Sequence, residues 1–308
     1  MREAFINTVT ELAAEDDKIF LLTGDLGFSV LEKFREKFPD RFLNIGVAEA
    51  NMVGVASGLA LSGKLVFIYS IVPFATMRCF EQIRNDVCMQ NLDIKIVGIG
   101  GGLVYGSAGP THHSIIDIAL MRALPNMTVV CPGDPIEVVF TIKESVKYKG
   151  PMYIRLGKGH EEQVHNNINC FEIGRGIVIR EGDDITIIAT GSMLGSAKEV
   201  TDKLVGKGIN VQLISMHTVK PIDKELILKS TIGKKAIFTI EEHSIIGGLG
   251  SAVAEILSEF KHKALFKRIG LKDTFIKDVG NREYLLEKNL LSVDDIVNNI
   301  FRIYKTIR

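Results

Sequence analysis

One acidic residue lies alone in a stretch of small and apolar residues. Glu49 is the only ionisable side chain between Phe42 and Ala60. The residues before it indicate a short strand that ends at Val47, and the apolar spacing from Glu49 onward indicates a helix. In the first helical turn the helix dipole favours the charged carboxylate, whereas an apolar setting favours the neutral acid. Such an acid can exchange a proton with a bound heteroaromatic ring; a solvated helix acid is the simpler alternative.

Two adjacent histidines, His112 and His113, follow a glycine-rich loop at 100–109. Adjacent side chains point apart in regular structure, so one ring can reach a site while the other packs or faces solvent. A histidine in such a loop is suited to proton transfer, and a purely structural histidine is the alternative. Acids and histidines show no metal-binding spacing, and the four cysteines indicate free thiols in a reducing cytoplasm.

Two glycine-rich stretches imitate nucleotide-binding fingerprints. The stretch 98–102 follows a strand, but no helix starts after it and no acid marks a later strand end, which argues against a nicotinamide site. The stretch 247–250 follows a strand and opens a helix. Tight packing of that helix on its sheet explains these glycines without a ligand.

Alternating strands and helices must position these residues. The pattern predicts strands at 18–23, 42–47, 64–69, 95–99, 128–131 and 152–156, and helices at 2–14, 30–38, 49–60, 74–90, 115–123 and 135–147. This alternation is typical of a parallel sheet covered on both faces. Ligands bind at the carboxyl ends of such strands, where 24–29 forms a polar turn.

The polar segment 157–170 has no apolar period and predicts a linker. Beyond it, strands are expected at 185–189, 211–215, 236–241 and 266–269, with helices that begin near 196, 223, 250, 281 and 293. We therefore predict two consecutive α/β domains. The first spans 1–160 and the second 172–308, with the linker at 161–171.

The composition excludes several classes of function. The chain has 308 residues, of which 46% are hydrophobic and 24% charged, enough for two domains with cores of their own. Basic and acidic residues balance at 37 each, so no overall charge attracts nucleic acid or an anionic membrane. No apolar run is long enough to span a bilayer, and the N-terminus lacks a signal-peptide profile. A cytoplasmic protein is therefore expected.

The segment NIGVAEANMVGVASGLAL at 44–61 resembles the part of thiamine-diphosphate enzymes of the transketolase group that carries the cofactor-activating glutamate. Two later segments resemble the same enzymes, namely GSAGPTHHSIIDIALMRALPNMTVVCP at 106–132 and IEEHSIIGGLGSAVAEIL at 240–257. The resemblance covers nearly the whole chain. It implies the C-terminal half of a transketolase as a separate subunit, with a pyrimidine-binding domain followed by a transketolase C-terminal domain.

The resemblance also implies roles for single residues. Glu49 matches the acid that shares a proton with N1′ of the aminopyrimidine of thiamine diphosphate, which lets the neighbouring exocyclic nitrogen take the proton from thiazolium C2. His112 matches a histidine that handles substrate hydroxyls or an oxyanion, and Asp25 an aspartate near the cofactor at the subunit boundary. Phe74 or Phe80 supplies the aromatic wall against the aminopyrimidine, with Phe74 preferred.

Further matches concern the substrate. Arg155 matches an arginine that holds the substrate phosphate by a forked contact. Arg2 and Ser29 match an arginine and a serine at the phosphate end. Ala108 stands where many transketolases have an aspartate that reads a hydroxyl of the donor sugar. The identity of the donor is therefore left open.

One half of the expected enzyme is missing. The chain has no Gly-Asp-Gly motif, with which the family's N-terminal domain holds a divalent metal and the cofactor diphosphate. The resemblance thus implies that the Mg²⁺ ligands lie on a partner N-terminal subunit, in an α₂β₂ assembly. The expected reaction transfers a two-carbon ketol unit from a ketose phosphate to an aldose phosphate. The alternatives are the β subunit of a 2-oxoacid dehydrogenase or decarboxylase, a deoxyxylulose-phosphate-synthase-like enzyme, and a non-catalytic interaction subunit.

Overall fold

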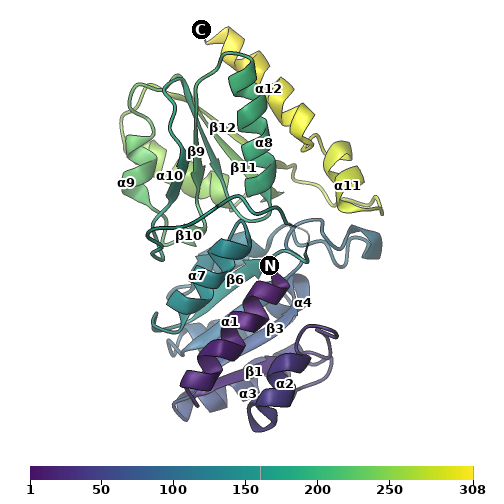
Figure 1. Ribbon diagram of the computed structural model, residues 1–308. Helices are drawn as coiled ribbons and strands as arrows, with labels where there is room; N and C mark the ends of the chain where they lie inside the picture. Colours follow the sequence, from purple (N-terminus) through teal and green to yellow (C-terminus); the bar gives the residue numbers. More distant parts are fainter. Residues whose placement is uncertain (160, 308) are drawn as a thin grey trace.

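The computed structural model describes residues 1–159 and 161–307 and contains two α/β units, one above the other in Figure 1. The N-terminus lies near the junction of the units and the C-terminus at the far end of the second unit. Each unit is built on a mostly parallel sheet, which confirms the predicted fold class. The predicted boundary residue, 160, lies outside the described residues.

The first unit contains a seven-stranded sheet with the order β10-β5-β6-β4-β3-β1-β2. Its strands are β1 (Ile19–Thr23), β2 (Phe42–Asn44), β3 (Leu65–Ile71), β4 (Ile94–Ile99), β5 (Thr128–Val130), β6 (Met152–Leu156) and β10 (Thr218–Lys220). All neighbours pair in parallel except β10, which is antiparallel to β5. The central strands β4 and β6 are buried along their whole length, as the continuous apolar runs of a doubly covered parallel sheet require.

Helices cover both faces of this sheet with separate apolar cores. One face carries α1 (Arg2–Glu15), α2 (Glu32–Lys37) and α7 (Pro135–Ser145). The other face carries α3 (Glu49–Leu61), α4 (Val72–Thr76) and α6 (Asp117–Ala123). Buried Phe5 on α1 stacks against Tyr69 on β3, so α1 is fixed to the middle of the sheet.

The second unit has a five-stranded sheet with the order β12-β11-β8-β9-β7. Its strands are β7 (Ile177–Arg180), β8 (Ile185–Ala189), β9 (Val211–Ser215), β11 (Ala236–Ser244) and β12 (Leu265–Leu271). Its helices are α8 (Met193–Gly206), α9 (Lys224–Lys229), α10 (Leu249–Glu259), α11 (Arg282–Lys288) and α12 (Val293–Thr306). In the described part of the chain, no helix is both long and apolar enough to cross a membrane.

One prediction of local structure was wrong, and two strands were missed. The expected helix at 74–90 is broken into α4, the short α5 (Phe80–Gln82) and the π-helix η2 (Ile83–Cys88). Strands β7 and β10 were not expected, because four and three residues are too few to show a period. Strand β10 lies beyond the linker in sequence but pairs with the sheet of the first unit. The chain therefore passes between the two units more than once.

The polar segment after β6 is held against the first unit. Oδ2 of Asp134 accepts hydrogen bonds from the backbone N–H groups of Val164 and His165, at 2.9 and 2.8 Å. Nε2 of His165 lies 2.8 Å from Oε1 of Glu137, and both side chains are buried. Buried acids of the first unit thus hold the backbone and the histidine of this segment. The sequence predicted a polar connection without an apolar period, and it did not predict these contacts.

Candidate active site

Glu49 is the first residue of α3, and its side chain is buried at 1% exposure. Its Oε1 accepts a hydrogen bond from Oγ of Ser70 at 2.9 Å, and its Oε2 accepts one from Nη1 of Arg78 at 2.8 Å. At the end of β1, a Cβ on Gly24 would lie 3.1 Å from Glu49 Oε1, so glycine permits a close approach there. The buried-acid prediction is confirmed, and the carboxylate faces the carboxyl ends of β1 and β3.

An aromatic and cationic row continues from this carboxylate. The guanidinium carbon of Arg78 lies 4.1 Å from the centroid of the Phe74 ring. That ring meets His112 edge to face at 5.2 Å, and the centroid of the Tyr105 ring lies 6.4 Å from that of His112. The structure therefore brings together three predicted site residues, Glu49, Phe74 and His112, from three separate segments. Phe80 instead packs against the apolar core beneath α3.

The two histidines point apart, as predicted. His112 is half-buried beside Phe74, with Nδ1 3.0 Å from Oγ1 of Thr111. His113 is buried, and within the described residues neither of its ring nitrogens has a hydrogen-bond partner. Burial lowers the pKa of His113, so its ring is neutral near pH 7. It lines a cavity of about 370 Å³ with Met77 and Phe275.

Two cations lie near Tyr105. Nζ of Lys158 lies 4.5 Å from the centroid of the Tyr105 ring. Burial raises the pKa of Tyr105, and the nearby charge of Arg2 acts in the opposite direction. A terminal guanidinium nitrogen of Arg2 would lie 3.9 Å from a Cβ placed on Gly159. Arg2, Lys158 and Tyr105 thus form a basic border next to the predicted substrate histidine.

The predicted residues Asp25 and Ser29 lie on the exposed turn after β1. Both have left-handed backbone, with φ of 57° and 62°. Asp25 exchanges two hydrogen bonds of 3.0 Å with Asn44 at the end of β2. The backbone N–H of Ser29 donates to Glu32. Asp25 is therefore fixed next to Gly24, at the border of the Glu49 site, whereas the described hydrogen bonds do not link Ser29 to Glu49 or His112.

Arg155 is placed differently from the prediction. Its side chain is buried, and Nε donates to Oδ2 of Asp117 at 2.8 Å. Its Nη2 donates to the carbonyl oxygens of Ser114 and Glu242. Burial opposes ionisation of Asp117, but the charge of Arg155 and the hydrogen bonds from Tyr153 and Arg155 outweigh it and lower the pKa of the carboxyl. A forked contact from Arg155 to a substrate phosphate stays a prediction that this geometry does not favour.

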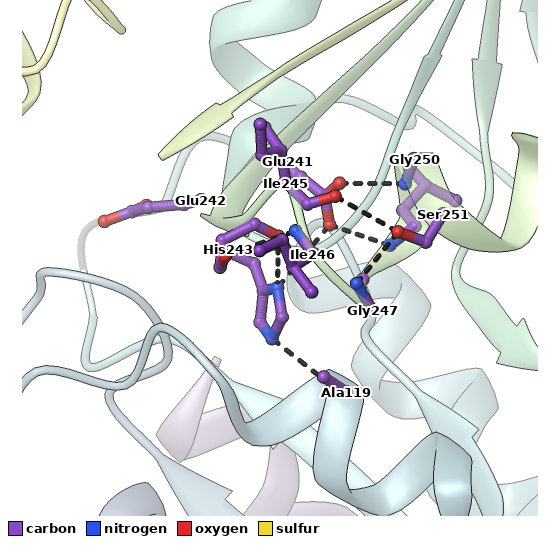
Figure 2. A network of polar contacts seen from close by, with 12 residues as sticks. Ala119, Glu241, Glu242, His243, Ile245, Ile246, Gly247, Gly250 and Ser251 are labelled. Atoms are coloured by element: carbon purple, nitrogen blue, oxygen red, sulfur yellow. Dashed lines mark hydrogen bonds and ion pairs between the residues drawn. The ribbon is translucent and has the colours of Figure 1, made fainter. Parts of the chain in front are cut away.

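The glycine-rich stretches have packing roles. Figure 2 shows Glu241 of β11 at the N-terminus of α10, where it accepts from the N–H groups of Leu249 and Gly250 at 2.7 and 2.8 Å. A Cβ on Gly248 would lie 2.0 Å from Oε2 of the same carboxylate. In the other stretch, a Cβ on Gly101 would lie 2.6 Å from the guanidinium of Arg155. These glycines make room for buried protein side chains, in agreement with the packing interpretation.

The same region joins the two units. Figure 2 also shows His243, whose Nε2 accepts from the N–H of Ala119 on α6 at 3.3 Å. Glu242 receives the N–H of Leu103 at 2.7 Å and pairs with Arg282 at 2.6 Å. Consecutive residues of β11 therefore bind a helix N-terminus, a loop of the first unit and a helix of the first unit.

Three residues of this site escaped the sequence analysis. Ser70 is a polar residue near the end of an apolar strand, which is a signal for a ligand edge. Arg78 lies four residues after Phe74, a spacing that brings side chains together on a helix. Asp117 pairs with a residue 38 positions away, and no local pattern announces such a contact. Across 1–159 and 161–307, no three His, Cys, Asp or Glu side chains are grouped as a metal would require.

Known proteins give the context for this geometry. The family profile "Transketolase, pyrimidine binding domain" matches residues 1–162, and "Transketolase, C-terminal domain" matches 174–296. A protein described as a transketolase C-terminal section from Methanocaldococcus jannaschii is 40% identical over 97% of this chain and 95% of its own length. A 6-deoxy-6-sulfo-D-fructose transketolase subunit from Clostridium sp. is 38% identical over 96% and 92%.

A solved structure described as a split gene transketolase, inactive beta4 tetramer, superposes with a TM-score of 0.91 at 40% identity. The match covers 100% of this chain and 99% of that chain. The fold, the matched family profiles and the relatives of similar length all indicate the same family. The chain belongs to the transketolase family, in which it is similar to the separately encoded C-terminal sections.

Proposed function

We propose that this chain is the β-type subunit of a split, thiamine-diphosphate-dependent transketolase, which transfers a two-carbon ketol unit between sugars. The observation that carries the proposal is the buried Glu49 carboxylate at the start of α3, which Arg78 connects to the face of Phe74. A carboxylate and an aromatic face are the two groups that an aminopyrimidine ring needs for a hydrogen bond at N1′ and for stacking.

The residues present fit the pyrimidine half of thiamine diphosphate. Ser70 orients one oxygen of Glu49, and the other oxygen binds Arg78, whose guanidinium lies over Phe74. When bound, the cofactor supplies a nucleophilic carbon for the ketol unit. Glu49 holds or releases the proton at N1′, and Phe74 fixes the plane of the ring. His112 lies against Phe74 and exchanges protons with hydroxyl groups of the substrate.

For the anionic end of the substrate, we propose Arg2 and Lys158. They lie near Tyr105, which neighbours His112, whereas Nε and Nη2 of Arg155 donate within the protein. Ser29 remains a weaker proposal for the same end. The expected substrates are sugar phosphates, and Ala108 leaves the donor open. The description of the Clostridium relative names a sulfonated sugar. Sulfonated sugars should therefore be tested as substrates together with sugar phosphates.

We further propose that a partner N-terminal subunit contributes the diphosphate and Mg²⁺ ligands, with Asp25 near the boundary between the chains. The split-gene relatives support a partner of this kind. An α₂β₂ assembly, a cytoplasmic location and the domain limits 1–160 and 172–308 stay predictions. The matched domain ranges leave residues 163–173 between them.

The proposal is tested by replacing Glu49 with Gln in the complex reconstituted with the N-terminal subunit. Loss of the proton-exchanging acid should lower turnover by about 10² to 10⁴. The matched control is Glu11→Gln, an exposed acid on α1, which should leave turnover unchanged. Equal turnover of the Glu49→Gln and wild-type complexes would contradict the proposal. Release of CO₂ from pyruvate by the wild-type complex would instead favour an oxoacid or deoxyxylulose-phosphate-synthase-like enzyme.

A further inference from the structure

Arg78 occupies a defined position between an acid and an aromatic ring. Its Nη1 donates to Glu49 Oε2 at 2.8 Å, and its guanidinium carbon lies 4.1 Å above the centroid of Phe74. The carboxylate is buried at 1% side-chain exposure, whereas the Arg78 side chain is 42% exposed. Since Ser70 holds the other oxygen from inside the protein, Arg78 lies on the solvent side of Glu49.

These two contacts are the ones that the proposed function assigns to the aminopyrimidine ring. A guanidinium and an aminopyrimidine protonated at N1′ are both planar, and each can donate an N–H to a carboxylate oxygen. Both also stack on an aromatic face. The guanidinium therefore satisfies Glu49 and Phe74 with the chemistry expected of the cofactor ring. The two groups compete for one carboxylate oxygen and one ring face.

The backbone around Arg78 suits a side chain that moves. Arg78 lies in the turn between α4, which ends at Thr76, and α5, which begins at Phe80. A π-helix follows directly, and such departures from α-helix geometry are frequent at functional sites. Because Arg78 is outside both helices and partly exposed, its side chain can turn toward solvent without disturbing the core.

We propose that Arg78 is an internal latch, which fills the place of the aminopyrimidine ring in the free chain and leaves it when the cofactor binds. The latch rests on the proposed function, because it needs Glu49 and Phe74 to be the aminopyrimidine site. It pairs a buried carboxylate that would otherwise lack a partner on its outer oxygen. In the free subunit Arg78 therefore occupies the aminopyrimidine site, and the cofactor ring must displace this side chain to bind.

The test is an NMR titration of the full chain with free 4-amino-5-hydroxymethyl-2-methylpyrimidine, the aminopyrimidine part of the cofactor. Arg78→Met keeps an apolar stem and removes the ion pair, so the pyrimidine should bind about tenfold more tightly than to wild type. Arg78→Lys keeps the charge without the planar fork and should lie between the two. The matched control is Arg84→Met, an exposed arginine that donates to its neighbour Asn85. Its affinity should equal that of wild type.

A second measurement follows the latch itself. The Nε–H signal of Arg78, identified by its absence in the Arg78→Met spectrum, should show an immobilised side chain in the free protein and a mobile one at saturating pyrimidine. Equal or weaker binding by Arg78→Met would overturn the latch and leave the proposed function intact. Absence of binding by wild type and Arg78→Met alike would overturn both, since Glu49 and Phe74 would then not form an aminopyrimidine site.

Discussion

Oδ2 of Asp117 accepts hydrogen bonds from Nε of Arg155 at 2.8 Å and from the hydroxyl of Tyr153 at 2.7 Å, with all three side chains buried. The arginine belongs to β6 of the first unit, yet it also donates to the carbonyl of Glu242 in the second unit at 3.0 Å. This ion pair therefore fixes a residue at the junction of the units. Arg155 therefore stabilises the junction of the two units, and the N–H groups that make these contacts are not available to a substrate.

Replacement of Arg155 by Met should lower the free energy of unfolding by about 3 to 5 kcal/mol, because Asp117 is then left buried without its counter-charge. Urea denaturation measures this loss. The control Arg35→Met, on the surface of α2, should change stability by less than about 0.5 kcal/mol. Unchanged stability together with a raised KM for phosphorylated sugars alone would contradict the junction role and restore the phosphate role.

The raised pKa of Glu241 predicts that the free energy of unfolding falls as the pH rises. Burial raises its pKa from 4.5 to about 7, against the opposing hydrogen bonds from Gly250 and Leu249. The folded protein then holds a proton that the unfolded chain releases near pH 4.5. This contribution is fully present below about pH 4.5, declines as pH rises and is lost above about pH 7, and it amounts to about 3 kcal/mol.

Glu241→Gln cannot titrate, so the difference in unfolding free energy between wild type and variant should change by that amount between pH 4 and pH 8. Denaturation at several pH values measures it. The matched variant Glu255→Gln, which alters an exposed acid of α10, should follow the wild-type profile. A constant difference between wild type and Glu241→Gln across this range would disprove the prediction.

The tie between Asp134 and the polar segment can be tested by proteolysis. Asp134 caps α7 through the N–H of Glu137 and binds the N–H groups of Val164 and His165. Asp134→Ala leaves these buried donors unsatisfied and should cost about 3 kcal/mol. Cleavage by a glutamate-specific protease at Glu161 or Glu162 should accelerate by at least about tenfold. If the cleavage rate stays at the wild-type value, the segment is held by other contacts.

Much of the fold follows from local patterns. Strands such as β4 and β6 are continuous apolar runs, and the N-caps Asp223 and Asn281 bind the first turns of α9 and α11. Glu49 was found because one charge in an apolar stretch is a local anomaly. Pairing at a distance leaves no such signal, as for Asp117 with Arg155 or β10 with β5. The broken helix around Arg78 was also missed, since its apolar spacing still resembles a single helix.

The central claim is that the cofactor site is shared between this chain and a partner. Calorimetric titration with thiamine diphosphate and Mg²⁺ tests it most directly, first on this chain and then on its mixture with the N-terminal subunit. The account predicts tight binding in the mixture and no tight binding to this chain alone. Tight binding of the complete cofactor to this chain alone would contradict it, because the diphosphate and metal ligands would then lie within these residues.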